Sequence, residues 1–313
     1  ATIQLKNALQ KNPDIGEARY LLGKLYFEQA DYPGAEKELT RALDAGYSAD
    51  EVVPILAKAL LASGQGDKID SLLTSRQLKQ PEARAALLTT QGLDLLGRGK
   101  REEGVVALNA ALKESPGYAL ARVGLARSRA LGRDLEGALA DVDGILKEAP
   151  KLVEANSLRG DLLLALNRFD EAVSAYEAVI AEKPTDVAAH QNLISVLLRQ
   201  NKLEAAQAKV AEMRKALGGH PLAVYLQSYV NVRNGKNDEA YEGIQQVLRS
   251  APDYLPAQLL AATLQLQRQD FVQAQENLNK VIARQPNLLL ARRLLVSTYV
   301  GMREPGRALE ALQ

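Results

Sequence analysis

The sequence contains no cysteine and no tryptophan, and only 4% of its 313 residues are aromatic. The absence of cysteine excludes disulfides and thiolate metal ligands. Basic and acidic side chains nearly balance, 39 against 38, so no overall charge attracts nucleic acid or an anionic membrane. Long apolar runs are also missing, since the charge-free stretch 254–267 is too short and too polar to span a bilayer. These absences disfavour a disulfide-rich domain, a nucleic-acid-binding protein and a membrane-spanning one.

Alanine recurs along the chain on a 34-residue grid, which a single inserted residue interrupts once. The grid points are Ala1, Ala35, Ile69, Gly104, Ala138, Ala172, Ala206, Ala240, Ala274 and Ala308. Four residues after each point stands an apolar side chain: Leu5, Leu39, Leu73, Leu108, Val142, Tyr176, Val210, Ile244, Leu278 and Leu312. A period of this length predicts a stack of small units, each buried only against its neighbours.

Two kinds of break divide every unit. Prolines stand twelve residues after seven of the grid points, at Pro13, Pro81, Pro116, Pro150, Pro184, Pro252 and Pro286. A second break between them is rich in Gly, Asn and Asp, as in 64–66 and 235–238. Because proline and glycine interrupt helices, each unit is predicted to hold a helix A, a short turn, a helix B and a proline turn. The fold class is therefore all-α, an α-solenoid of antiparallel helix pairs.

This unit resembles the tetratricopeptide repeat. The range 16–49 carries the likeness best, with Leu22-Gly23, Tyr26, Ala35, Leu39 and Ala42 at the family's spacings, although the family's helix A tryptophan is missing throughout. The resemblance implies a right-handed superhelix in which the A helices line the inner face.

The resemblance extends over the whole chain as one array. Residues 1–15 form a trailing helix B, and 289–313 a truncated repeat. The complete repeats are expected at 16–49, 50–84, 85–118, 119–152, 153–186, 187–220, 221–254 and 255–288. Because both ends cut through a repeat, we expect a fragment of a longer protein, and the uncapped ends predict weak self-association.

A narrower likeness concerns the first part of the chain. Residues 4–13, 18–26 and 35–39 resemble the tetratricopeptide lipoproteins that accompany bacterial exosortase and PEP-CTERM sorting systems. Those proteins are associated with exopolysaccharide production and lie outside the cytoplasm. The resemblance implies an envelope or periplasmic location, with a lipid anchor in the missing N-terminal part. A cytoplasmic location is the alternative.

Catalytic signatures are absent from the sequence. It has no phosphate-binding glycine loop, no H-E-x-x-H and no G-x-S-x-G. The two histidines, His190 and His220, fall at different repeat positions and are interpreted as surface residues. The segment Asp141-Val142-Asp143-Gly144 is similar to part of a calcium loop, but Val142 is a core position and no further ligands follow. We therefore predict a non-catalytic protein without metal or cofactor.

The expected binding surface is the inner face of the A helices, since solenoids bind partners on their concave side. One candidate cluster is Tyr20, Lys24 and Phe27. The second is Tyr225, Tyr229 and Arg233, an i, i+4, i+8 stripe of residue types that dominate interface hot spots. The remaining partner-binding candidates are the basic residues Lys58, Arg127 and Arg199. The alternative for the tyrosines is that they only fill the contact between adjacent A helices.

Two features limit these expectations. Chaperone-binding members of the family hold a terminal carboxylate with asparagines and basic residues at set points on the A helices. Here those points carry Asn192 but Ser195 beside it, and elsewhere Leu21, Leu158 and Leu226. This carboxylate clamp is therefore not expected in the present chain. In the second unit Ile69 replaces the grid alanine and Arg76 replaces the small residue seven positions further on. The segment 74–80 lacks a clear apolar stripe, and the inserted residue follows near Pro81, between the second and third units. A local offset or hinge is predicted there.

The sequence thus favours a protein-interaction scaffold that grips a protein or peptide segment, in envelope or exopolysaccharide assembly or secretion. The alternative is a regulatory or targeting array of a larger enzyme, such as a glycosyltransferase. Nucleic acid is disfavoured as a partner by the neutral charge. Contact with a membrane is expected only through a lipid anchor outside this sequence.

Overall fold

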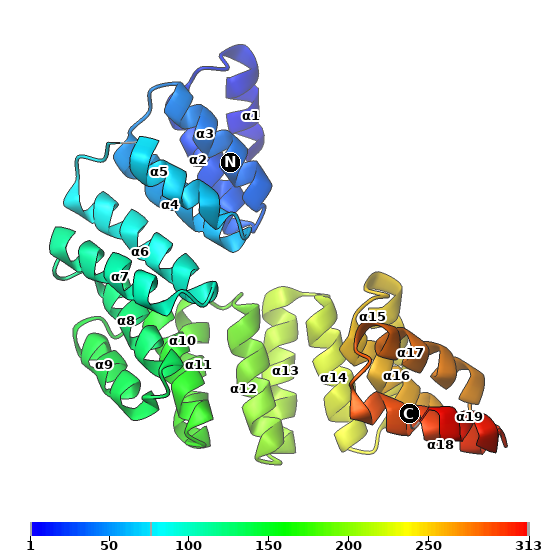
Figure 1. Ribbon diagram of the computed structural model, residues 1–313. Coiled ribbons are helices and arrows are strands. Elements are labelled where there is room, and N and C mark those ends of the chain that lie inside the picture. The colour runs from blue at the N-terminus through cyan, green and yellow to red at the C-terminus, as the bar shows by residue number, and fades with distance from the viewer. Residues whose placement is uncertain (1, 76, 312–313) are drawn as a thin grey trace. The chain divides into compact units, whose positions relative to one another are not determined.

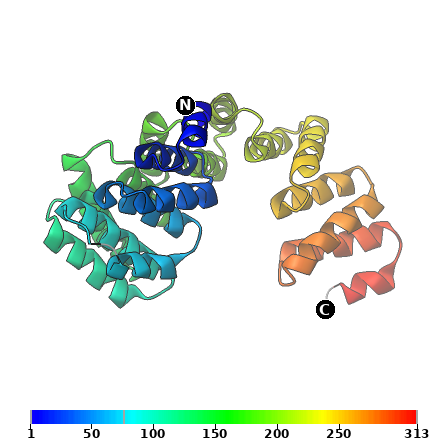
Figure 2. The ribbon, with the colours of Figure 1, turned by 90° about the horizontal axis from the view of Figure 1, so that it is seen from above.

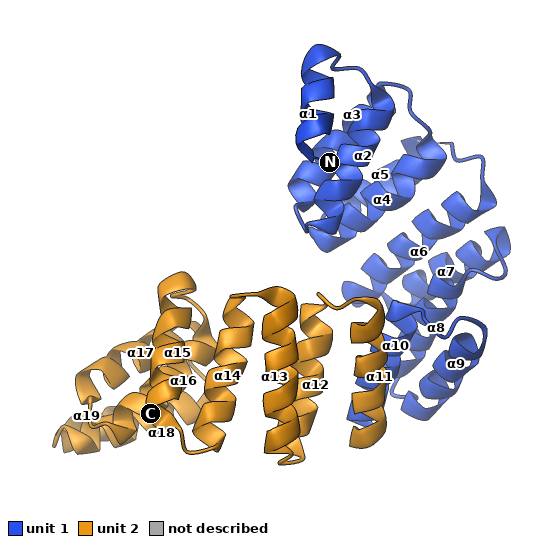
Figure 3. Ribbon diagram, turned by 180° about the vertical axis from the view of Figure 1, so that it is seen from behind, with its two compact units in different colours: residues 1–168 blue, residues 169–313 orange. Residues whose placement is uncertain are grey.

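The computed structural model describes residues 2–75 and 77–311. These residues form nineteen α-helices and no β-strand (Figure 1). The all-α solenoid class predicted from the repeat is confirmed. The chain divides into two compact units, residues 1–168 and 169–313, which are coloured separately in Figure 3. Each unit is described by itself.

Unit 1 contains ten helices. They are α1 (Thr2–Lys11), α2 (Gly16–Glu28), α3 (Tyr32–Asp44), α4 (Ala49–Ala62), α5 (Gly66–Ser75), α6 (Pro81–Gly97), α7 (Arg101–Glu114), α8 (Ala119–Leu131), α9 (Leu135–Glu148) and α10 (Val153–Ala165). Even-numbered helices are the A helices of the repeats, and odd-numbered ones the B helices. The boundary with unit 2 falls in the turn after α10, inside the range predicted for the fifth repeat.

Unit 2 contains nine helices within its described residues. They are α11 (Phe169–Glu182), α12 (Val187–Arg199), α13 (Leu203–Leu217), α14 (Pro221–Arg233), α15 (Asn237–Ser250), α16 (Leu255–Gln267), α17 (Phe271–Arg284), α18 (Leu289–Gly301) and α19 (Pro305–Glu310). Figure 2 shows α14 to α19 following one another as successive helix pairs. The helices alternate as predicted, while the assignment of the whole chain to one array with these repeat boundaries stays a prediction.

Every described grid position is buried. Ala35, Ala138, Ala172, Ala206, Ala240 and Ala274 are 0% exposed. The residues four positions further on fill the core beside them, except that Leu5 and Leu73 are only half-buried and Leu312 lies outside the described residues. The small side chains are needed because the two helices of a repeat cross closely. A Cβ added at Gly92 on α6 would lie 2.7 Å from Cγ of Leu108 and 3.0 Å from the carbonyl oxygen of Gly104, both on α7.

Each turn from helix A to helix B passes through a residue with positive φ. Glycine occupies this position at Gly64, Gly99 and Gly235, whereas Asn167 and Asn201 adopt φ of 60° and 58°. In the second repeat the amide of Gln65 donates to the carbonyl of Leu60 at 2.8 Å, which is the hydrogen bond of a Schellman cap. Glycine and asparagine tolerate the left-handed conformation best, which explains the composition of this break. Ala30, Arg133, Gln269 and Arg303 adopt it as well.

The irregular segment between the second and third repeats has a clear structural form. Helix α5 ends at Ser75 after ten residues, whereas α6 begins at Pro81, four residues ahead of the predicted range, and is seventeen residues long. Leu78, from the segment that lacked an apolar pattern, is nevertheless buried in the core with Leu60 and Leu87. The structure therefore shows a local offset here. Arg76 lies outside the described residues, and the hinge stays a prediction.

Replacing Gly92 by Ala is expected to lower the free energy of unfolding of unit 1 by about 1–3 kcal/mol, because the added methyl group overpacks the crossing of α6 and α7. Gly97→Ala is the matched control, since nothing lies within 4 Å of a Cβ at that end of α6. That variant should be neutral or more stable by up to about 1 kcal/mol, as alanine favours helix. Urea unfolding monitored by circular dichroism measures both. Equal effects of the two substitutions would contradict the close-crossing account.

If the predicted hinge exists, the backbone amides of α5 should exchange hydrogen faster than those of α3. Helix α5 buries only Gly66 and Ile69, whereas α3 buries five residues, so local opening of α5 costs less. We expect its backbone amides to exchange at least about tenfold faster, measured residue by residue in the native protein. Equal protection of α3 and α5 would exclude the hinge.

Candidate functional site

Unit 2 carries two adjoining hollows on the face formed by its A helices. The first has a volume of about 390 Å³ and is bordered by the A helices α14, α16 and α18, by the end of the B helix α17 and by the turn before α18. Its wall is mostly apolar, and the residues used below are Tyr225, Tyr229, Arg233, Leu255, Leu259 and Leu288. Three of these elements, α14, α16 and α18, are consecutive A helices, the kind of helix on which the binding face is predicted.

The second hollow has a volume of about 380 Å³ and is bordered by α12, α14 and the start of α16. Gln191, Ser195 and Arg199 give it a more polar wall. The two hollows share Tyr225, Tyr229, Arg233 and Pro256, and we call them together the unit 2 groove. The structure thus brings together four of the nine predicted partner-binding residues, namely Arg199, Tyr225, Tyr229 and Arg233.

The tyrosines of α14 form the ridge between the two hollows. The rings of Tyr225 and Tyr229 lie 6.4 Å apart, and Tyr254, which precedes α16, meets Tyr225 edge-on at 5.3 Å. All three pack against the core of α14, α15 and α16 and remain half-buried. Burial raises the pKa of Tyr225 to about 12, with smaller contributions from Tyr254 and Tyr229. These side chains therefore fill the helix contact and also line the groove, and their role in binding a partner stays a prediction.

The arginines at the groove are exposed and have neutral partners. Nη2 of Arg233 donates to Oδ1 of Asn201 at 2.8 Å. The guanidinium of Arg199 lies over the ring of Phe169, 4.9 Å from its centroid. These contacts orient the two side chains without neutralising their charge.

The predicted cluster on α2 is arranged differently. Tyr20 stacks on Tyr47 with ring centroids 5.0 Å apart, and Phe27 lies 5.9 Å from Tyr32. Both are half-buried and pack against the core formed by α3, α4, α5 and the start of α6. Lys24 instead lines a separate hollow between α1 and α2. The structure does not join the three side chains in one pocket.

The remaining basic candidates lie apart in unit 1. Lys58 is half-buried on α4, and Arg127 is exposed on α8. Helix α6 is the A helix between them in the chain. Their role in binding a partner stays a prediction.

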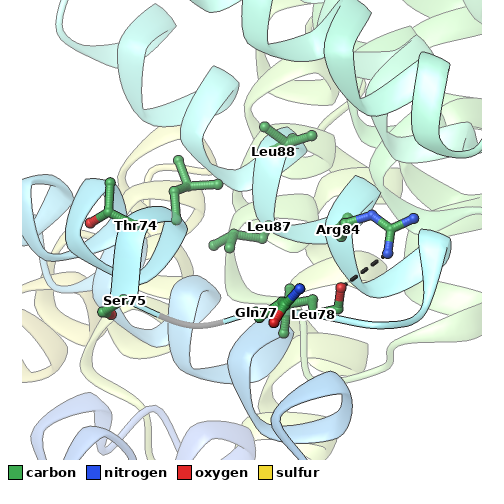
Figure 4. Close-up of a pocket in the computed structure, with 8 residues that line it drawn as sticks. Thr74, Ser75, Gln77, Leu78, Arg84, Leu87 and Leu88 are labelled. Atoms are coloured by element: carbon green, nitrogen blue, oxygen red, sulfur yellow. Dashed lines mark hydrogen bonds between the residues drawn. The ribbon is translucent and has the colours of Figure 1, made fainter.

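Sequence reasoning located the offset after α5 but missed the hollow that accompanies it (Figure 4). This hollow has a volume of about 620 Å³ and lies between the end of α5 and the start of α6. Arg84 is the charged side chain among its described lining residues. Its Nε donates to Glu114 at 2.6 Å and its Nη1 to the carbonyl of Leu78 at 3.0 Å. The guanidinium of Arg84 therefore holds the segment between α5 and α6 in place and already has Glu114 as its ion-pair partner.

The interpretation of His190 as a surface residue is wrong. Its side chain is 1% exposed, and Nε2 lies 2.9 Å from the carbonyl oxygen of Pro184. Equivalent side chains six residues after a proline donate to that proline's carbonyl in other repeats: Arg19, Asn156, Gln258 and Arg292. A hydrogen-bonding side chain six residues after the proline therefore recurs along the chain, and it satisfies the proline's carbonyl oxygen in the turn before helix A. His220, by contrast, is exposed and caps α14, accepting from the amide of Leu222 at 3.2 Å.

The acidic residues of the calcium-like segment are engaged in ion pairs. Asp141 pairs with Arg129 at 2.9 Å and Asp143 with Arg159 at 2.7 Å, while Val142 is 0% exposed. Within the described ranges, no group of three or more acidic or histidine side chains is placed to hold a metal ion. None of the helices in those ranges is long and apolar enough to cross a membrane.

Two models of the tetratricopeptide repeat match this chain. One covers residues 4–58, and the other covers 89–152 and 157–221, which together make up more than half of the sequence. The chain therefore belongs to the tetratricopeptide repeat family, whose members bind protein or peptide partners. Among proteins with curated annotation, none matches the sequence.

Solved structures with similar folds include the Cut9–Hcn1 hetero-tetramer of APC/C, at 17% identity and a TM-score of 0.65. The match covers 93% of this chain and 57% of that one, so the chain spans little more than half of its neighbour. PilF of Pseudomonas aeruginosa matches at 18% identity and a TM-score of 0.59, over 69% of this chain and 98% of that one. A tetratricopeptide repeat protein from Parabacteroides merdae matches at 17% identity and a TM-score of 0.52, over 90% and 98%. At these identities the likeness concerns the fold alone.

The burial of Tyr225 predicts a loss of stability at alkaline pH. In the unfolded chain its phenol ionises near pH 10, whereas the folded protein keeps the proton until about pH 12. Between these values the unfolded state binds fewer protons, so this residue lowers the free energy of unfolding as pH rises, by at most about 1.4 kcal/mol per pH unit. Tyr225→Phe should remove this component, and its stability relative to wild type should increase from pH 8 to pH 11 in urea unfolding. A difference that does not change with pH would contradict the assignment.

Proposed function

We propose that this protein is a non-catalytic scaffold that binds a protein or peptide segment in the unit 2 groove. The observation that carries the proposal is the convergence of Tyr225, Tyr229, Arg199 and Arg233 on two adjoining hollows. Aromatic and arginine side chains in partly desolvated pockets provide most of the binding energy in protein interfaces. The tyrosines are already packed against the core, so little conformational entropy is lost when a partner binds.

The scaffold would act by orientation and by raising the local concentration of its partner. A segment that crosses α12, α14, α16 and α18 in turn would contact the polar hollow first and the apolar hollow second. The A helices are held in register by the buried grid positions of unit 2, so the groove is preformed.

We also propose that the full-length protein works in bacterial envelope or exopolysaccharide assembly or secretion, anchored by a lipid on a part of the protein outside the present sequence. The support is the likeness of residues 4–13, 18–26 and 35–39 to lipoproteins of PEP-CTERM systems. The compartment in which the full-length protein is found tests this part of the proposal.

Short random peptides displayed on phage and selected on the immobilised protein test the binding function. We expect recovered peptides to bind wild type and to lose about 30-fold or more in affinity for Tyr229→Ala, the effect of removing an aromatic hot spot. Fluorescence polarisation with the synthesised peptides measures the change.

Tyr241→Ala is the matched control. Tyr241 lies on the B helix α15, is half-buried, and packs against the same core as Tyr229, but it lines neither hollow of the groove. Its loss should reduce stability and leave affinity unchanged. Recovered peptides that bind both variants as well as wild type would place binding elsewhere and overturn the proposed function.

A further inference from the structure

The unit 2 groove carries charge of one sign. Its described lining residues include Arg199 and Arg233 and no Asp or Glu. Acidic side chains next in sequence to residues of the groove are paired with basic ones: Asp170, beside Phe169, with Lys202 at 2.7 Å, and Asp253, beside Tyr254, with Arg284 at 3.0 Å. The lining therefore has a net positive charge although the whole chain is nearly neutral.

Neutral partners hold both arginines in place. The amide of Asn201 accepts one hydrogen bond from Arg233, and the ring of Phe169 lies beneath Arg199. Among the described residues, these guanidinium contacts are with Asn201 and Phe169, and neither arginine forms an ion pair with a carboxylate. A guanidinium has five N–H donors and favours bidentate contact with a carboxylate, so each retains donors for an incoming acid.

The two arginines occupy equivalent positions in consecutive repeats. They stand 34 residues apart, at the C-terminal ends of the neighbouring A helices α12 and α14. A segment that crosses from one helix to the next at this level meets both charges. The apolar hollow begins immediately beyond, where Tyr229 and Arg233 border it together with Leu255, Leu259 and Leu288.

We propose that the unit 2 groove selects acidic peptide segments in which a carboxylate lies beside an aliphatic or aromatic side chain. The carboxylate binds between Arg199 and Arg233, and the apolar side chain enters the hollow of about 390 Å³ between α14 and α16. The phenols of Tyr225 and Tyr229 border both compartments and can donate a hydrogen bond to the peptide. This inference rests on the proposed function and specifies the chemistry of its ligand.

The composition of the selected phage-displayed peptides tests this inference. Wild type should enrich Asp and Glu over the starting library, together with Leu, Ile, Phe, Trp or Tyr. The double variant Arg199→Glu, Arg233→Glu should enrich Lys and Arg instead, while the apolar enrichment persists. For a synthesised acidic peptide, Arg233→Gln should weaken binding about tenfold, the effect of one charge-assisted hydrogen bond. Arg249→Gln, an exposed arginine on the B helix α15, is the control and should change nothing.

Three outcomes would overturn the inference, and they are distinguishable. Peptides that depend on Tyr229 but show no acidic enrichment would remove the carboxylate specificity and leave the proposed function standing. Selection of peptides that bind independently of Tyr229 would overturn both the carboxylate specificity and the proposed function. A dimer of the protein that dissociates on Tyr229→Ala, seen by analytical ultracentrifugation, would assign the groove to a second copy of the chain. Circular dichroism of each variant separates misfolding from lost contacts.

Discussion

The close crossing of helix A and helix B within each repeat is the contact on which the rest of the structure depends. At Gly92 the two helices are so near that a single added carbon would meet Leu108 at 2.7 Å, and at Gly23 it would meet Leu39 at the same distance. Glycine or alanine at the crossing and a large apolar residue four positions after the grid point satisfy this geometry together. Because helix B covers one side of helix A, and the neighbouring repeats cover two others, only one side of each A helix stays free.

That free side is where the repeats differ, and the groove arises from the differences. The position of Tyr225 in α14 is occupied by Leu259 in α16 and by Arg293 in α18, each 34 residues further on. The position of Tyr229 holds Thr263 in α16. Large aromatic side chains on one helix therefore face shorter ones on the next, which leaves the apolar hollow unfilled. Packing keeps the grid uniform, whereas the free side can vary without disturbing the core.

Much of the fold and part of the site could be predicted from periodicity. The helix pairs, the buried alanines and the stripe on α14 follow from a spacing that the helix geometry imposes. The role of His190 could not be predicted in this way, because the spacing marks only which residues face the core. The same position carries Arg19, Asn156 or Gln258 in other repeats, so polarity alone suggested exposure. Only the three-dimensional path of the proline turn shows that its carbonyl requires a donor there.

By itself the sequence determined the repeat, the helix pairs and the all-α solenoid class, because burial at a 34-residue period leaves one way to pack these helices. It also indicated Tyr225, Tyr229 and Arg233 as a stripe on one helix. Tertiary structure decided which candidates share a site. It placed Arg199 beside that stripe, packed Tyr20 and Phe27 against the core of unit 1, and brought Tyr254 and Leu288 to the groove. The physical reason is that helical spacing fixes neighbours within one helix, whereas a groove is formed by side chains from several helices.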